Sequence, residues 1–351
     1  MTPAFMIYGA NGYVGEAAVR LAVASGLQPI IAGRNEISLK KLANELGLKF
    51  RVFDLNDQDT VNDALKDVKV ILHCAGPYIH TYQPMVEACL KNGTHYLDLT
   101  GEIPVYSAIA ARGAEARARG VMLLPGVGFD VVPTDCLALH LKQRLPTATH
   151  LTLAFQSEGP AGLPPGTQKT AIELLTFGDR VRKAGRLQVP EESEKLRLID
   201  FGNGPLQAVR LTWGDVYTAY HSTGIPNIED YTVLPESTRK QMALMRSMAP
   251  LLKLPGLRIL LKRGVRPGAT DSQRTRTSVH VWGEVMDEQG RKATARLHGP
   301  EAGLVWTTRA ALAAVNKVLS GSAPTGYQTP ASAYGPDFVL ECEGIIREDV
   351  D

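Results

Sequence analysis

A glycine pattern near the start of the chain restricts its fold more than any other feature of the sequence. Gly9, Gly12 and Gly15 recur at every third position directly after the apolar run Ala4–Tyr8. The residues after the turn have the spacing of a helix with one buried face: Val14, Ala17, Ala18 and Leu21. Glycine in such a turn lets the backbone approach a pyrophosphate, to which the helix start offers N–H groups. The pattern is therefore a variant of the dinucleotide-binding turn, with a merely tight strand-to-helix turn as the alternative.

Strand and helix patterns alternate between residues 4 and 145. Six short apolar runs predict strands: Ala4–Tyr8, Pro29–Ala32, Lys49–Phe53, Val68–Cys74, His95–Leu99 and Val121–Leu124. Helical patterns lie between them, such as the stripe Leu39, Leu42, Ala43 and Leu46, which Gly47 ends. Strands joined by helices form a parallel sheet that is covered on both faces. We therefore predict an α/β fold, a doubly wound Rossmann-type parallel sheet.

The second half of the chain has a different pattern. Alternating apolar and polar residues predict strands at 151–155, 208–213, 277–282 and 293–297, and a helix at 307–319. A second, α+β domain built on a largely antiparallel sheet is expected, and a length of 351 residues allows about two domains. We place a Rossmann domain at 1–147, a substrate and dimerisation domain at 148–300, and a returning helix and tail at 301–351.

Ligands of doubly wound sheets bind beyond the carboxyl ends of the strands. Glycine or a polar residue stands at nearly every predicted strand end. The cofactor-binding residues expected from these ends are Gly9, Asn11, Gly12, Tyr13, Val14, Gly15, Arg34, Asn35, Asp54, Ala75, Gly76 and Pro77.

Arg34, at the end of the second predicted strand, decides the choice of cofactor. NAD sites carry an acidic residue here for the ribose 2′-hydroxyl, whereas an arginine accommodates a 2′-phosphate. No carboxylate occurs between Arg34 and Glu36. NADP(H) is therefore preferred over NAD(H), with a solvated surface arginine as the alternative. Asp54 either accepts a hydrogen bond from the adenine amino group or only caps the following helix.

The sequence lacks patterns that mark several other enzyme classes. No tyrosine has a lysine four residues later, and there is no G-x-S-x-G, H-E-x-x-H or P-loop pattern. Short-chain dehydrogenases, elbow-type hydrolases, zincins and P-loop ATPases are therefore disfavoured. Hydride transfer needs neither a metal nor a protein nucleophile, because the nicotinamide carries the reactive hydrogen. We accordingly expect no metal site.

Candidates for binding substrate and handling a proton lie on the loops after the fourth to sixth predicted strands: Tyr78, His80, Tyr82, Asp98, Glu102 and Asp130. The predicted catalytic set is Glu102, Asp130 and Tyr78. Glu102 and Asp130 are carboxylates at strand ends, where a proton donor can meet a nicotinamide ring. Helix capping ahead of Pro104 and Pro133 is the alternative role.

Charge and apolar patterning limit the partners. The formal net charge of +2 gives little reason to expect a nucleic-acid partner. The four cysteines lack metal-ligand spacing, and neither a signal peptide nor a run long enough for a membrane helix is visible, so a cytoplasmic location is expected. The apolar and basic stretch 248–263 is the exception. Packing against the second domain is favoured for it, and contact with a membrane surface is the alternative.

Seven stretches together carry a family resemblance: Gly9–Gly15, Ala32–Asn35, Ala75–Tyr78, Tyr96–Glu102, Pro125–Asp135, Trp213–Ala219 and Gly326–Ala331. They resemble the saccharopine dehydrogenase-like family, especially its branch of short reductases that includes the trans-acting enoyl reductases. The resemblance implies an N-terminal NAD(P)-binding domain, an inserted α+β domain and a C-terminal segment that returns to the first.

The resemblance also implies an activity. Members of the family reduce imine-type adducts or enoyl groups, so the expected function is that of an NADP(H)-dependent oxidoreductase acting on a small or lipid-like substrate. A non-catalytic NADP(H)-binding sensor or scaffold is the alternative. A homodimer formed through the sheet of the second domain is a further expectation from the family.

Overall fold

The structure, a computed structural model, describes residues 4–174, 177–192, 195–247, 261 and 263–350. The chain divides into two compact units. The first extends to Val132 and includes the later segments Gly303–Tyr334 and Glu341–Glu343. The second comprises Pro133–Ala302, Gly335–Leu340 and the residues from Gly344 on. The divisions thus fall at 132/133 and 302/303, whereas the sequence analysis put them at 147/148 and 300/301, and the tail contributes to both units.

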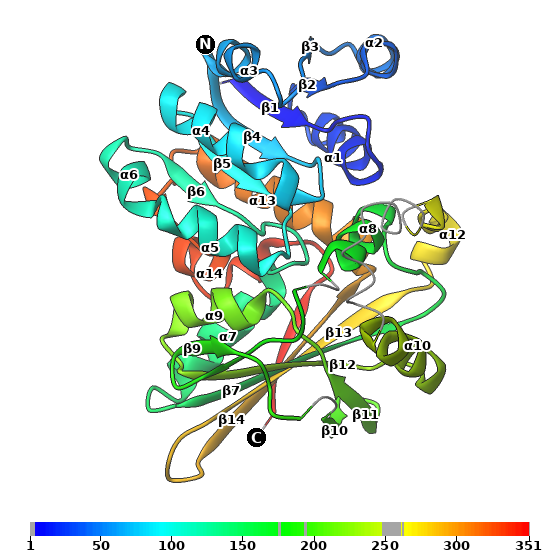
Figure 1. Cartoon of the computed structure of the whole chain (residues 1–351), viewed down its shortest axis with the longest axis vertical. Coiled ribbons are helices and arrows are strands. Elements are labelled where there is room, and N and C mark those ends of the chain that lie inside the picture. Colours follow the sequence, from blue (N-terminus) through cyan, green and yellow to red (C-terminus); the bar gives the residue numbers. More distant parts are fainter. Residues whose placement is uncertain (1–3, 175–176, 193–194, 248–260, 262, 351) are drawn as a thin grey trace. The chain divides into compact units, whose positions relative to one another are not determined.

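A parallel sheet forms the centre of the first unit (Figure 1). Its strands are β1 (Ala4–Tyr8), β2 (Ile30–Gly33), β3 (Phe50–Val52), β4 (Val68–His73), β5 (His95–Asp98), β6 (Met122–Leu124) and β15 (Gly326–Tyr327). They lie in the order β15-β6-β5-β4-β1-β2-β3, and each pairing is parallel. This order confirms the predicted Rossmann-type sheet, to which β15 adds a short edge strand.

Helices cover both faces of this sheet. The elements are α1 (Tyr13–Ala24), α2 (Glu36–Leu46), α3 (Gln58–Leu65), η1 (Tyr78–His80), α4 (Tyr82–Asn92), α5 (Ile103–Ala111), α6 (Gly113–Ala118), the π-helix η3 (Ala302–Trp306), α13 (Thr307–Leu319) and α14 (Pro330–Tyr334). Side chains of α3 to α6 pack with Met6 and Tyr8 in one apolar cluster. Helix α13 contacts α1, β4 and β5. Both faces of the sheet are therefore buried beneath helices, as is usual for a parallel sheet.

Capping residues determine where several of these helices begin and end. Asn35 caps α2 by accepting a hydrogen bond from the Ser38 N–H at 3.0 Å, and Asp57 caps α3 through Thr60. Gly47 and Gly93 end α2 and α4 with positive φ angles of 68° and 73°, which residues with a Cβ rarely adopt. Local capping chemistry thus fixes where α2 begins and ends, where α3 begins and where α4 ends.

The second unit is built on a mixed sheet. Its strands are β7 (His150–Glu158), β8 (Val181–Lys183), β9 (Arg186–Gln188), β10 (Leu196–Asp200), β11 (Pro205–Arg210), β12 (Asn227–Thr232), β13 (Ser278–Met286), β14 (Lys292–Pro300) and β16 (Ile346–Val350). The main order is β10-β11-β12-β7-β13-β14-β16. Only the β12–β7 pairing is parallel among those described, so the predicted, largely antiparallel sheet is confirmed.

The remaining helices belong to the second unit, although α7 and η4 begin and end beside a division: α7 (Val132–Arg144), α8 (Pro165–Leu174), α9 (Asp215–Thr223), α10 (Glu236–Ser247), α12 (Asp271–Arg274) and η4 (Phe338–Glu341). Helix α7 packs closely on β13, because a Cβ at Gly283 would lie 2.7 Å from the Leu141 side chain. Trp282 packs with Tyr231 in a separate apolar cluster. Most of the 248–263 stretch lies outside the described residues, and among the residues described no helix is long and apolar enough to cross a membrane.

Candidate functional site

The turn after β1, from Gly9 to Gly15, is packed so closely that its glycines leave little room for a side chain, and we call it the glycine cradle. An ideal Cβ at Gly15 would lie 2.1 Å from the Gly9 carbonyl oxygen, and one at Gly12 would lie 3.1 Å from the same atom. Gly9 has a φ of 80°, and its N–H donates to the Ala32 carbonyl at the end of β2 at 2.8 Å. The turn is thus held against β2, with Gly12 exposed at its surface and Gly15 buried against the Gly9 carbonyl. This geometry fits a pyrophosphate group.

Helix α1 begins in this turn. Gly12 is its N-cap without a side-chain hydrogen bond, and Tyr13 and Val14 are its first two residues. The backbone N–H groups of a first helical turn have no partner within the helix, and the helix dipole there favours an anion. Asn11 lies between the turn and β2, since its Oδ1 would lie 3.0 Å from a Cβ at Gly33. The predicted pyrophosphate residues are therefore brought together at one sheet edge.

Arg34 follows β2 with its side chain 74% exposed. Its Nη1 lies 4.0 Å from Oδ2 of Asp54, which follows β3. Oδ1 of Asp54 accepts hydrogen bonds from the backbone and the side chain of Asn56. Asn35 instead uses its side chain to cap α2. A long, exposed guanidinium at the end of β2 can pair bidentately with a phosphate, which is the geometry that a 2′-phosphate requires.

The end of β4 lies against the glycine turn. A Cβ at Gly9 would lie 3.0 Å from the Ala75 backbone nitrogen, so these two strand ends approach as closely as their backbones allow. Thr81 holds the loop by donating its hydroxyl to the Ala75 carbonyl at 2.7 Å. Gly76 and Pro77, joined by a cis peptide bond, complete the loop. Ala75 therefore lies against the glycine turn, and Gly76 and Pro77 follow it in the same loop.

Glu102 holds the next part of the same loop. Its carboxylate is fully buried, and its oxygens Oε1 and Oε2 accept the backbone N–H groups of Tyr78 and Ile79, each at 2.8 Å. Both oxygens are thus engaged with backbone N–H groups, an arrangement that stabilises the charged form of a carboxylate. The geometry supports a positioning function for Glu102, and helix α5 begins directly after it.

Tyr78 is also buried, with 7% of its surface exposed. Its hydroxyl donates to the His73 carbonyl at 3.3 Å, and its ring meets the His73 ring edge-on. Burial raises the pKa of Tyr78 well above its usual value and lowers the pKa of His73 to about 3. Both side chains pack in the sheet core, so the Tyr78 hydroxyl faces the protein interior.

Asp130 is the half-buried member of the predicted catalytic set. A Cβ at Gly101 would lie 2.7 Å from its Oδ2, so the carboxylate lies against the loop after β5. The preceding residue, Phe129, donates its N–H to Thr307 Oγ1 at 3.2 Å, and its ring packs edge-on against Trp306. Asp130 is therefore held at the ends of β5 and β6, next to Gly101.

The arrangement around Asp98, the last residue of β5, is not predicted by the sequence pattern. Its buried carboxylate accepts three hydrogen bonds, from the Tyr96 hydroxyl and from the N–H groups of Thr100 and Gly126. The available signal was an acidic residue at the last position of an otherwise buried strand. Its partners could not be read from the sequence, because Gly126 lies 28 residues away.

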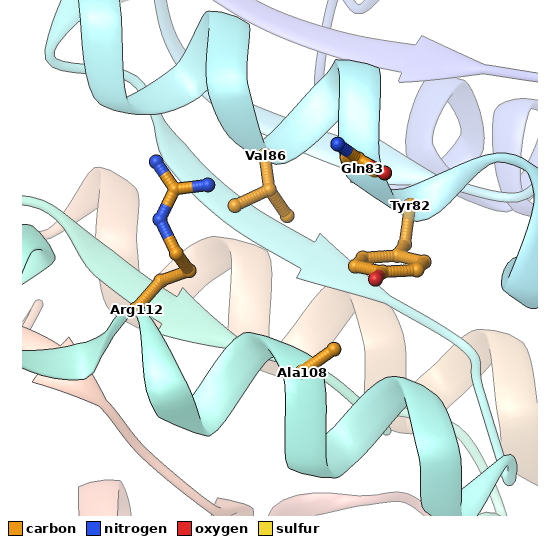
Figure 2. Close-up of a pocket in the computed structure, with 5 residues that line it drawn as sticks. All are labelled: Tyr82, Gln83, Val86, Ala108 and Arg112. Carbon is orange, nitrogen blue, oxygen red and sulfur yellow. The ribbon is translucent and has the colours of Figure 1, made fainter.

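His80 ends η1, next to the residues that Glu102 holds, whereas Tyr82 lies apart from this group. Tyr82 lines a surface pocket of about 170 Å³ between α4 and α5 with Gln83, Val86, Ala108 and Arg112 (Figure 2). Arg112 is paired there with Glu115. None of the predicted cofactor or catalytic residues lines this pocket, so we do not assign it to the cofactor. Within the described ranges, no three His, Cys, Asp or Glu side chains group as metal ligands would.

Comparison with known proteins connects this geometry to a family of domains. The family model described as "Saccharopine dehydrogenase NADP binding domain" matches residues 5–124. A mouse protein named saccharopine dehydrogenase-like oxidoreductase is 30% identical over 200 residues, which are 50% of this chain and 46% of that protein. The trans-acting enoyl reductase of Mycobacterium leprae is 32% identical over 148 residues, 40% of this chain and 35% of that one. The chain thus spans about half the length, or less, of these curated relatives.

A solved structure matches the whole fold. It is apo saccharopine dehydrogenase (L-Glu forming) from Saccharomyces cerevisiae, with a TM-score of 0.68 over 99% of this chain and 100% of that one. At 12% identity this likeness shows the fold alone.

Proposed function

Because residues 5–124 are similar to the saccharopine dehydrogenase NADP binding domain, we propose that the chain is an NADP(H)-dependent oxidoreductase that reduces an imine or enoyl group. The observation that carries the proposal is the glycine cradle, in which a Cβ at Gly15 would lie 2.1 Å from the Gly9 oxygen. Because Gly15 has no Cβ, helix α1 can begin directly against the Gly9 carbonyl, and the N–H groups of its first turn support binding of a pyrophosphate there. The names of the relatives support the reaction class, and a small or lipid-like substrate is part of the proposal.

Arg34 supports NADP(H) over NAD(H). Its exposed guanidinium is the cation at the end of β2, and its 4.0 Å separation from Asp54 leaves its donors available to a phosphate. Each charge-assisted hydrogen bond contributes about 1.5–3 kcal/mol, so the net loss of one such bond should weaken NADPH binding by roughly 10- to 100-fold.

The reduction needs a hydride and a proton. Bound dihydronicotinamide supplies the hydride. Of the three predicted catalytic residues, Asp130 is the least buried, although its Oδ1 atom is enclosed, and this supports Asp130 as the group that transfers a proton to substrate. Glu102 and Tyr78 are buried, and their hydrogen bonds support a positioning function for the loop that follows β4.

Titration of the purified protein with NADPH, NADH and 2′,5′-ADP tests the cofactor half of the proposal. Tighter binding of NADPH than of NADH is expected, and Arg34→Ala should remove the difference. Arg186→Ala, at an exposed arginine on β9, is the matched control and should change neither affinity. Equal affinity of the natural protein for NADH, or an Arg34→Ala variant that still prefers NADPH, would rule out this function of Arg34.

A screen of imines, enoyl thioesters and ketones, followed by the absorbance of NADPH, tests the catalytic half. Binding of NADPH without turnover of any of these classes would favour the alternative, a sensor or scaffold. The homodimer, the cytoplasmic location and membrane contact through 248–263 stay predictions.

A further inference from the structure

The carboxylate of Asp98 is enclosed at the carboxyl end of β5. None of its surface is exposed, and its oxygens accept three hydrogen bonds. Oδ1 accepts the N–H groups of Thr100 and Gly126, each at 2.9 Å, and Oδ2 accepts the Tyr96 hydroxyl at 2.7 Å. One buried side chain therefore connects β5 and the loop after it to the loop after β6.

Backbone contacts extend this connection toward Asp130. The Asp98 carbonyl accepts the Val127 N–H at 2.8 Å, and the Gly126 carbonyl accepts the Val131 N–H at 2.8 Å. Asp130 lies between these anchored residues, and its Oδ2 would lie 2.7 Å from a Cβ at Gly101. The two segments that flank the Asp130 carboxylate are thus both fixed to Asp98.

The same segment continues to Glu102. Thr100 accepts the Glu102 N–H through its side chain at 3.1 Å and the Tyr106 hydroxyl through its carbonyl at 2.5 Å. Glu102 in turn holds the N–H groups of Tyr78 and Ile79 after β4. Two buried carboxylates, four residues apart, therefore tie together the ends of three adjacent strands.

Burial of a carboxyl group at this position costs free energy. Burial disfavours its charged form and raises the pKa of Asp98 to about 7, against the lowering effect of its three hydrogen bonds. The negative charge of Glu102 also raises the pKa of Asp98. The charge of Asp98 in turn raises the pKa values of the nearby groups Tyr78, Tyr96 and Cys74. An apolar side chain would avoid this cost but could not accept two backbone N–H groups from different loops.

We infer that Asp98 is a positioning residue of the proposed reaction centre, which sets the loops after β5 and β6, and with them the Asp130 carboxylate, opposite the nicotinamide. The inference rests on the proposed function. Asp98 would affect only one end of the cofactor. The adenosine end would lie at β1 to β3, whereas Asp98 acts at β5 and β6. Loss of Asp98 should therefore disturb the nicotinamide and leave the adenosine phosphate unaffected.

Binding and fluorescence of NADPH, compared with binding of 2′,5′-ADP, test this separation. Asp98→Ala should bind 2′,5′-ADP within about 3-fold of the natural protein, while its NADPH affinity falls by about 10-fold or more and the emission of bound NADPH changes. Asp98→Asn keeps the Oδ1 acceptor and can donate to the Tyr96 oxygen, so it should retain the natural affinities and emission.

Thr94→Ala is the matched control. Thr94 is equally buried and donates to the Val68 carbonyl at 2.9 Å, but it lies at the opposite end of β5. It should lower stability without changing NADPH emission.

Three results would overturn the inference alone. The first is natural NADPH emission in Asp98→Ala. The second is altered emission in Asp98→Asn, which decides the question if the alanine variant does not fold. The third is an equal change of emission in Thr94→Ala. A natural protein that binds neither NADPH nor 2′,5′-ADP would instead contradict the proposed function and this inference with it.

Discussion

The carboxylate of Glu102 accepts the backbone N–H of Tyr78 at 2.8 Å across 24 residues of sequence. Its second oxygen accepts the N–H of Ile79, so a single side chain satisfies two consecutive backbone donors of η1. Charge-assisted hydrogen bonds from buried backbone groups are among the stronger contacts of a folded chain. Glu102 therefore couples the start of α5 to the loop after β4, which borders the proposed cofactor site.

Replacement of Glu102 by glutamine tests this coupling. An amide nitrogen would face either the Tyr78 or the Ile79 N–H, so one buried donor would lose its acceptor. We expect the free energy of unfolding to fall by about 1–3 kcal/mol, measured by urea denaturation. Glu36→Gln, on the exposed first turn of α2, is the control and should change stability by less than about 0.5 kcal/mol. Equal stability of Glu102→Gln and the natural protein would contradict the coupling.

Gly15→Ala tests the glycine cradle. The added Cβ would lie 2.1 Å from the Gly9 oxygen, so the turn must shift. Overpacking of this kind costs about 1–3 kcal/mol, and the shift should weaken NADPH binding by roughly 10-fold or more. Thermal unfolding and NADPH titration measure the two effects. Gly166→Ala, where an added Cβ meets nothing within 4 Å, serves as control. Unchanged NADPH affinity in Gly15→Ala would argue against a pyrophosphate at this turn.

The pKa of Asp98 predicts a pH-dependent stability. Burial raises this pKa from 3.8 to about 7, so the folded protein keeps a proton that the unfolded chain releases. Stability contributed by this group is therefore full below about pH 4, is lost as the pH rises to about 7, and stays constant above it. Asp98→Asn removes the titration. Its stability relative to the natural protein should rise between pH 4 and 7 by up to about 4 kcal/mol.

Urea denaturation of both proteins across this pH range measures the difference. His73, with its pKa lowered to about 3, titrates in both proteins and cancels in the comparison. Thr94→Ala should follow the natural protein at a constant offset. Parallel curves for Asp98→Asn and the natural protein would mean that Asp98 has an ordinary pKa.

Asp130 is expected to handle the proton of the reaction. On a substrate that the natural protein reduces, Asp130→Asn should lower kcat by about 10²- to 10⁴-fold while NADPH affinity stays nearly constant. Gly101→Ala should have the same direction of effect, because its Cβ would lie 2.7 Å from Asp130 Oδ2 and displace the carboxylate. NADPH consumption gives the rate. Asp63→Asn, at an exposed residue of α3, is the control, and full activity in Asp130→Asn would exclude the role.

Much of the fold follows from local sequence. Six of the seven strands of the first sheet are predicted within a few residues, because their apolar runs are bounded by glycine, proline or capping residues such as Asn35 and Asp57. The glycine turn could also be predicted from the sequence, because its three glycines all belong to one local turn.

The long-range contacts of the site could not be predicted from the sequence in this way. Glu102 and Asp98 could be recognised as strand-end carboxylates, but the partner Tyr78 lies 24 residues from Glu102 and the partner Gly126 lies 28 residues from Asp98. Only the sheet order brings these groups together. The short strand β15 escaped prediction for the same reason, because its two residues form a strand only by pairing with Met122 and Leu123.

Strands β15 and β16 have a consequence for how the protein is made. They are edge strands of different sheets, yet both come from residues 326–350. Domains generally fold as they leave the ribosome, the N-terminal one first. Here the edge strand of the first sheet is synthesised only after the main segment of the second unit, Pro133–Ala302, has emerged. Neither sheet can reach its full width before this segment is translated, so completion of the two units is a late and nearly simultaneous event in biosynthesis.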